Sequence, residues 1–217
     1  MSKEMQSFEA QLAEEAAKIK QTLGAPASAK ISTKGKMFTL PDGTTNPGPM
    51  SCVILDYISF NNWYEGVYDA ANPKPPVCWA FNRIVADLSP SAECPKPQAE
   101  SCDPCPKNQF GSAGRGKACK NIRRLLVAPV TATVDSKPMT LEVSPSAIRV
   151  FDNFVLQTTK ELGSMPIQVI VDIGFDASKA YPSLTFENAK LHSNLETMMH
   201  LREVGQHILL MEPTPES

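Results

Sequence analysis

The middle of the chain is set apart by its cysteines and prolines. All six cysteines lie between Cys52 and Cys119, and 11 of the 19 prolines lie between Pro41 and Pro106. Proline has a fixed φ and no backbone N–H, so a proline-rich stretch adds little to helices or central strands. A long connection without such elements is uncommon in a compact domain. The segment 73–120 therefore needs something other than apolar burial to hold it.

The rest of the chain has the composition of an ordinary folded protein. Its 217 residues are 42% hydrophobic and 20% charged, and the formal net charge is −2. These values exclude a disordered chain, a collagen-like chain and a histone-like basic protein. The length fits one domain or two small ones.

The sequence predicts a soluble protein without a membrane partner. Residues 3–22 carry seven charged side chains, so they do not form a signal peptide, and no window approaches the ~20 apolar residues of a membrane span. We expect an intracellular, cytoplasmic location, where thiols stay reduced. The cysteines then indicate a metal site or buried thiols before they indicate disulfides.

The hydrophobic pattern predicts helices near both ends and strands between them. Strands are expected at 36–40, 52–60, 77–83, 122–134, 140–143, 167–173 and 181–186. Helices are expected at 3–22, from Ser144-Pro145 to about Leu162, and at 192–211, with Ser144 as the N-cap of the second. Cys52 alternates with apolar neighbours and is expected in the core. Short strands with varied loops favour a small barrel and a mainly β, α+β fold class.

The cysteine spacing predicts one structural zinc ion. Cys102-x2-Cys105 has the spacing of a zinc knuckle, and Cys119 follows fourteen residues later. A tetrahedral site needs a fourth ligand, and the three histidines all lie beyond residue 190. Cys78 and Cys94 are the candidates. We favour Cys78, because a ligand in a strand would attach the long segment to the sheet, and keep Cys94 as the alternative.

A purely basic stretch lies beside these cysteines. Residues 107–124 contain no Asp or Glu. Their positive side chains are Lys107, Arg115, Lys117, Lys120, Arg123 and Arg124. Lysine and arginine on a flexible loop suit phosphate contact. The match to a Walker loop fails, because Ala118 stands where the magnesium-binding hydroxyl is required, so NTP hydrolysis is not expected.

Aromatic residues gather upstream of the basic stretch. They are Tyr57, Phe60, Trp63, Tyr64, Tyr68, Trp79, Phe81 and Phe110. About half are expected to fill the core. Trp63, Tyr64 and Tyr68 follow the strand 52–60 and are better candidates for exposure. Exposed aromatic rings among basic side chains bind unpaired bases by stacking. No catalytic constellation accompanies them, so we expect no enzyme.

Several blocks of the sequence belong together, namely residues 31–43, 53–57, 68–69, 75–80, 102–112, 116–125, 175–176 and 181–186. As a set, these blocks resemble bacteriophage single-stranded DNA-binding proteins. The most specific are the Cys-x2-Cys-Pro-x-Asn block that starts at Cys102 and the Gly-Lys-Ala-Cys-Lys-Asn block that starts at Gly116. The resemblance covers residues 31–190. It implies an OB-like barrel with a zinc-bearing insertion and a non-enzymatic role in phage DNA replication or recombination.

These interpretations divide the chain into three parts. Residues 1–24 are an N-terminal helical arm, 25–190 an OB-like domain with the insertion at about 73–120, and 191–217 a C-terminal helix and short tail. The protein would act in the cytoplasm of the host cell.

The first functional hypothesis is a protein that coats or protects single-stranded DNA. Its groove would use the rings of Trp63, Tyr64, Trp79 and Phe110 for stacking. Phosphates would be bound by Arg115, Lys117, Lys120, Arg123 and Arg124. The alternative is a phage-encoded adaptor that binds a host polymerase or nuclease through the zinc insertion, which the near-neutral net charge favours. A zinc-dependent enzyme is disfavoured by the all-cysteine ligand set. Phage or host replication proteins are possible partners, and the oligomeric state is left open.

Overall fold

The computed structural model describes residues 29–66, 69, 72 and 74–213. The predicted helix 3–22 and Tyr68 lie outside the described residues. Within the described residues the protein is a mixed α+β fold, mostly sheet, with two α-helices. The predicted combination of a sheet with a C-terminal helix is therefore confirmed at this level.

The main sheet has seven strands. They are β1 (Lys30–Ile31), β4 (Met50–Trp63), β5 (Cys78–Asn82), β6 (Lys120–Pro129), β7 (Met139–Val143), β8 (Val169–Phe175) and β9 (Leu184–Leu191). Their order is β1-β7-β6-β4-β8-β9, with β5 also paired to β4, and only the β1–β7 pair is parallel. A separate small hairpin joins β2 (Phe38–Thr39) and β3 (Thr45–Asn46).

The described strands form an open sheet and not the predicted closed barrel. β1 and β9 end the strand order, and they are not paired with each other. The OB-like closure is thus not found among the residues that the structure describes. The sequence indicated the longer strands, but it extended β6 to residue 134 instead of Pro129 and missed the two-residue strands β1 and β3. Closure depends on which distant edges meet, and strand periodicity carries no information on that.

Strand β4 is the centre of the sheet. One of its edges pairs with β6 along Cys52–Asn62. The other edge is shared, because β8 pairs with its first residues, Met50–Val53, and β5 with its last, Ser59–Trp63. The insertion, which contains β5, is therefore attached to the far end of the longest strand.

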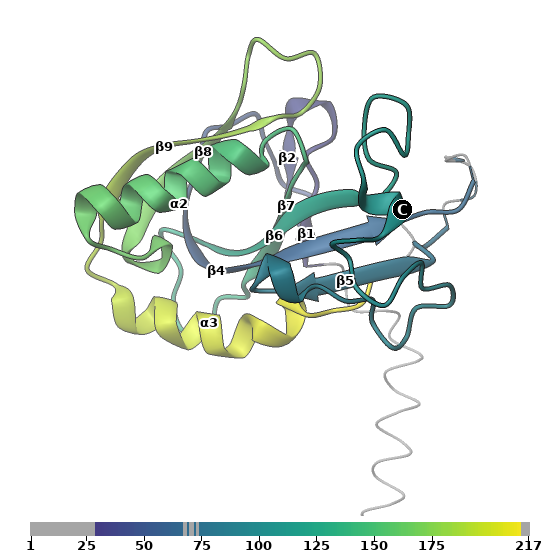
Figure 1. Ribbon diagram of the computed structural model, residues 1–217. Helices are drawn as coiled ribbons and strands as arrows, with labels where there is room; N and C mark the ends of the chain where they lie inside the picture. Colours follow the sequence, from purple (N-terminus) through teal and green to yellow (C-terminus); the bar gives the residue numbers. More distant parts are fainter. Residues whose placement is uncertain (1–28, 67–68, 70–71, 73, 214–217) are drawn as a thin grey trace, which may run out of the picture.

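Both faces of the sheet are covered by a helix. Phe151 and Phe154 of α2 (Ile148–Leu162) pack in the same core cluster as Ile54 of β4. On the opposite face, residues of α3 (Leu195–Leu209) such as Leu201 pack with Val53 of β4. Figure 1 shows the two helices on opposite sides of the sheet. Strand side chains alternate between the two faces of a sheet. Because a helix covers each face, Cys52 and Ile54 on one face of β4 and Val53 and Leu55 on the other are all apolar.

The helices follow the predictions except at one end. Gly163 ends α2 with a φ of 61°, in the left-handed region that glycine adopts without strain. The predicted N-cap is wrong: α2 begins at Ile148, and the cap position is Ala147. The hydroxyl of Ser144 instead meets that of Ser146 at 2.9 Å, in a turn before the helix.

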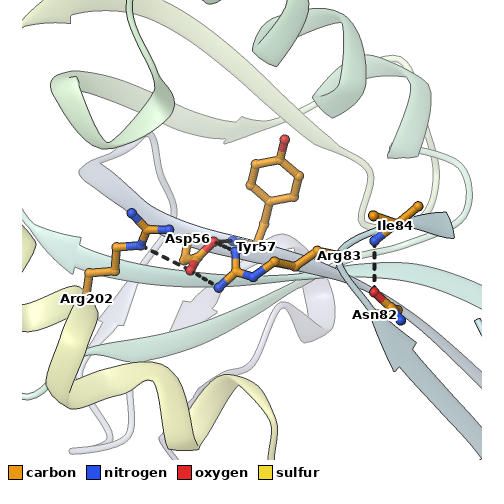
Figure 2. A network of polar contacts seen from close by, with 6 residues as sticks. All are labelled: Asp56, Tyr57, Asn82, Arg83, Ile84 and Arg202. Atoms are coloured by element: carbon orange, nitrogen blue, oxygen red, sulfur yellow. Dashed lines mark hydrogen bonds and ion pairs between the residues drawn. The ribbon is translucent and has the colours of Figure 1, made fainter. Parts of the chain in front are cut away.

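A buried ionic cluster sits at an irregularity of β4. The pairing with β6 shifts between Ile54 and Asp56, which places the Asp56 carboxylate inside the protein, only 6% exposed. It accepts two hydrogen bonds from Arg83, one from Arg202 Nε at 3.2 Å and one from the Tyr57 N–H at 2.8 Å. Figure 2 shows the carboxylate between the two guanidinium groups. The cluster joins β4 to α3 and to the residue that follows β5.

Candidate nucleic-acid interface and thiol pocket

The four cysteines predicted as zinc ligands line one small pocket, which we call the thiol pocket. Its walls include Cys78, Cys102, Cys105 and Cys119. All four side chains are buried, at 7–9% exposure. The free space between these walls is about 10 Å³, roughly that of one water-sized sphere.

Backbone hydrogen bonds bring these cysteines together from separate parts of the insertion. Cys78 begins β5, and Cys119 immediately precedes β6. The N–H of Cys102 donates to the Leu88 carbonyl at 2.9 Å, and the N–H of Cys119 donates to the Lys107 carbonyl at 2.8 Å. Cysteines from separate parts of the insertion therefore line one pocket.

Cys94, the alternative fourth ligand, lies outside the lining of the thiol pocket. Its sulfur accepts a hydrogen bond from the Trp79 N–H at 3.0 Å and donates one to the Trp79 carbonyl at 3.1 Å. Both bonds fix the thiol beside the strand that carries Cys78. The Cys94 thiol also interacts with the Cys78 thiol, so the structure leaves the choice between these two cysteines open.

Two of the pocket thiols have raised pKa values. Burial is the main cause, with the neighbouring thiols adding to it: the pKa of Cys102 rises to about 11 and that of Cys119 to about 12. Among the described residues, no three His, Cys, Asp or Glu side chains converge as they do around a bound metal ion. The four thiols therefore share a pocket without already forming a tetrahedral set. Their chemistry, four sulfur donors and no open carboxylate or imidazole position, fits a structural Zn²⁺.

Beside the thiol pocket, three aromatic rings each carry a lysine ammonium. Lys107 Nζ lies 4.9 Å from the ring centre of Trp63, Lys120 Nζ lies 5.1 Å from Tyr64, and Lys117 Nζ lies 5.2 Å from Phe110. These distances are within cation–π range. We call these six residues the lysine–aromatic surface. Five of the six are among the predicted site residues, and Lys107 joins them from the predicted basic stretch.

Four members of this surface are contiguous on the pocket side of the sheet. Trp63 and Lys107 also line the thiol pocket, as does Asn108. The Asn108 Oδ1 accepts a hydrogen bond from Lys117 Nζ at 3.3 Å, which links the Trp63 pair to the Phe110 pair. The remaining pair lies at the end of β4, because Tyr64 follows the last strand residue, Trp63, and Lys120 is paired in register with Asn62.

The loop after Phe110 presents Arg115, another of the predicted phosphate-binding side chains. Gly111 N–H and Ala113 N–H both donate to the Gly116 carbonyl, at 3.0 and 3.1 Å, which folds residues 111–116 into a tight loop. Arg115 is exposed within this loop, and the Phe110 side chain before it is 83% exposed. Both side chains are therefore accessible to a ligand, as predicted.

Two predicted contact residues are buried instead. Trp79 is 8% exposed, because β5 pairs with β4 and places the indole in a core cluster with Phe60. Arg124 is 7% exposed: its Nη1 donates to the carbonyls of Leu209 at 3.2 Å and Met211 at 2.7 Å, and its guanidinium lies 4.0 Å from the Phe60 ring centre. As folded, neither side chain is available to stack a base or bind a phosphate.

Arg123 is held by α2. Its guanidinium donates to both carboxylate oxygens of Asp152, at 3.1 and 2.9 Å. The side chain is only 14% exposed. This ion pair fixes β6 against the helix, so Arg123 is positioned as a structural residue and is removed from the predicted phosphate contacts.

Asn108 and Asn121 are the residues that the sequence analysis missed. The Asn121 amide donates to Asn108 Oδ1 at 2.9 Å, and the Asn108 amide donates to the Cys102 carbonyl at 2.8 Å. The signal was present, since both asparagines belong to the two most specific sequence blocks. Because their side chains are uncharged, they suggested no ligand chemistry. In the structure their hydrogen bonds are to the protein itself.

Comparison with known proteins leaves the family open. Protein-family models, curated proteins and solved structures give no match to this chain. The resemblance to phage single-stranded DNA-binding proteins therefore rests on its sequence blocks alone. Among the described residues, no helix has the length and apolar character needed to cross a membrane.

Proposed function

We propose that this chain is a non-enzymatic, single-stranded DNA-binding protein of a bacteriophage, which coats or protects single strands during replication or recombination. The observation that carries the proposal is the lysine–aromatic surface: three accessible or half-buried rings, each paired with a lysine, at one end of the sheet. An unpaired strand offers both matching groups, since its bases stack on rings and its phosphates bind ammonium groups.

Duplex DNA would fit this surface poorly. Its bases are already stacked and paired, so only the phosphate contacts remain available. Each base–ring stack contributes about 1–3 kcal/mol, which gives single strands the advantage. The few charges of the surface, in a chain of net charge −2, predict moderate affinity that falls with salt.

We further propose that one structural Zn²⁺ binds Cys78, Cys102, Cys105 and Cys119. When bound, the ion supplies four metal–sulfur bonds to a segment that has little apolar core of its own. The role of the four cysteines is to fix the insertion on β4 and β6. Support comes from their common pocket and their burial.

The proposed function is tested by binding of a fluorescent oligonucleotide, followed by anisotropy, from about 50 to 300 mM salt. We expect single-stranded DNA to bind more tightly than a duplex of the same length, with affinity falling as salt rises. Equal affinity for duplex and single strand, or no response to salt, would contradict the proposal. The variant Lys160→Ala, at an exposed position near the end of α2, is a matched control that should bind like the wild type.

The adaptor hypothesis keeps one supporting observation. Phe110 is a large apolar side chain at 83% exposure, which a protein partner could also cover. Affinity capture from host lysate, with and without nuclease, separates the two functions. A stoichiometric protein partner that survives nuclease treatment, together with no binding of the oligonucleotide, would favour the adaptor.

A further inference from the structure

We propose that metal binding in the thiol pocket and single-strand binding by the lysine–aromatic surface are energetically coupled, and that Asn108 is the residue that couples them. This inference rests on the proposed function of both sites. It adds a regulation that neither site has by itself: loading with Zn²⁺ would raise the affinity for single strands, and single strands would raise the affinity for Zn²⁺.

Asn108 bonds to both sites through one side chain. Its amide nitrogen donates to the carbonyl of Cys102 at 2.8 Å. Its Oδ1 accepts from Lys117 Nζ at 3.3 Å and from the amide of Asn121, at the start of β6, at 2.9 Å. Its backbone N–H donates to the carbonyl of Cys105 at 2.9 Å. One half-buried residue therefore joins the Cys-x2-Cys turn, the basic loop and the sheet.

Lys107 provides a second connection. Its carbonyl accepts the Cys119 N–H at 2.8 Å, while its ammonium lies over the Trp63 ring. Gln109 adds a third connection, because its Nε2 donates to the carbonyls of Asp103 at 2.7 Å and Cys105 at 3.2 Å. The segment that presents the lysines is thus hydrogen-bonded to the backbone of three of the four pocket cysteines.

The coupling follows from the cost of ordering this segment. Between β5 and β6 the described residues form only two short 3-10 turns, so hydrogen bonds and the cysteines set the segment's shape. An ion that fixes Cys102, Cys105 and Cys119 also fixes the backbone that carries Lys107 and Asn108. A single strand that binds the ordered surface then loses less conformational entropy on binding. Because such coupling is reciprocal, the strand must favour the metal-bound state by the same factor.

The Tyr64–Lys120 pair gives an internal contrast. Lys120 belongs to β6 and is paired in register with Asn62 of β4, so the sheet places it without the thiol pocket. Its contribution to binding should be the same with and without metal. The coupling should therefore be confined to the Trp63 and Phe110 pairs.

The experiment measures the affinity of a labelled single-stranded oligonucleotide for Zn²⁺-loaded and chelator-treated protein at one salt concentration. We expect metal removal to weaken binding at least about fivefold. Competition with a chromophoric chelator should show zinc affinity rising by the same factor when the oligonucleotide is saturating. Asn108→Ala should still take up one Zn²⁺ and bind the strand, but with less difference between the two states. Gln98 lines the same pocket, but its side-chain amide bonds to the Lys96 carbonyl and not to the lysine–aromatic surface. Gln98→Ala should therefore keep the full difference in strand affinity between the two states.

The outcomes separate the proposals. Equal strand affinity with and without metal overturns the coupling and leaves single-strand binding intact. No strand binding in either state overturns the proposed function and the coupling with it, and no zinc uptake overturns the metal site and the coupling. If Asn108→Ala keeps the full difference in strand affinity between the metal-loaded and metal-free states, Asn108 is not the residue that couples the sites. If Asn108→Ala does not fold, the two wild-type affinities still decide whether the sites are coupled.

Discussion

Two neighbouring arginines of β6 are bound by different helical segments. Arg123 and Arg124 are adjacent in the sequence, yet one is paired with Asp152 of α2 and the other with carbonyls at the end of α3. Adjacent strand residues point to opposite faces, and here both faces carry a helix. The sequence shows the charges, but whether a helix covers them depends on packing between segments far apart in the chain.

Phe110 gives the most direct test of stacking. Phe110→Ala should weaken single-strand binding by about 1–3 kcal/mol, because one base loses its ring. The free energy of unfolding should stay the same, since the side chain is 83% exposed. Anisotropy titration and urea unfolding measure the two quantities. Leu156→Ala removes an apolar side chain that is 67% exposed on α2, and should change neither.

Asp56 predicts a pH dependence of stability. Burial alone raises its pKa, but the hydrogen bonds and charges of Arg83 and Arg202, with the Tyr57 N–H, outweigh burial and leave the pKa below its usual value of about 3.9. A carboxylate with a depressed folded-state pKa stabilises the protein above its unfolded-state pKa, and this stabilisation is lost as the pH falls through the folded value. Stability should therefore fall below about pH 4.

The variant Asp56→Asn isolates this contribution. It should lower the free energy of unfolding at pH 7 by about 2 kcal/mol, below the usual cost of breaking a buried pair because Arg83 is half exposed and can be rehydrated. The loss of stability below pH 4 should become shallower. Urea unfolding at pH 7 and pH 3 checks both points, and an unchanged acid slope would remove Asp56 as the cause.

At the scale of elements, the strand that ends at the surface and the loop beside it have different tasks. β4 and β6 place Trp63 and Lys120 through their register, whereas the loop 111–116 presents Arg115 by its own internal hydrogen bonds. The long central strand β4 was predictable, since its apolar, β-branched run is long. The β4 irregularity at Asp56 was not, because it depends on pairing with β6.

The basic loop and the buried arginine should separate in their response to salt. Arg115→Ala or Lys117→Ala should each reduce the slope of log affinity against log salt by about 0.7, if each neutralises one phosphate. Arg124→Met should leave the slope unchanged but lower stability by about 1–3 kcal/mol, because carbonyls near the end of α3 lose their donor. A changed slope for Arg124→Met would show that this residue contacts phosphate.

At the scale of the whole molecule, the thiol pocket lies apart from the two core clusters that α2 and α3 cover. The core clusters on the α2 and α3 faces contain no cysteine of the thiol pocket. From the sequence, the thiol grouping was predictable by spacing and the need for four ligands. The open sheet was not, since the short β1 and the edge position of β9 follow from long-range pairing.

Metal removal should therefore affect the segment around the thiol pocket more than the strands of the sheet. We expect one Zn²⁺ per chain by native mass spectrometry, lost in Cys102→Ser and Cys78→Ser but retained in Cys94→Ser. Chelation should raise amide hydrogen exchange in residues 83–119 while β6 to β8 stay protected. Full zinc retention by Cys102→Ser would contradict the assignment, and zinc loss in Cys94→Ser but not Cys78→Ser would exchange the fourth ligand.

The position of the surface at the end of β4 also has a mechanical consequence. The β4–β6 ladder runs for ten residue pairs from Cys52 to Asn62, parallel to any pull exerted on Trp63 along the strand. A pulling force on a nucleic acid bound there, in that direction, would load the hydrogen bonds of the ladder in shear. Under shear these bonds break together instead of one by one. If the proposed binding holds, a single strand under tension would be held by the longest strand of the sheet.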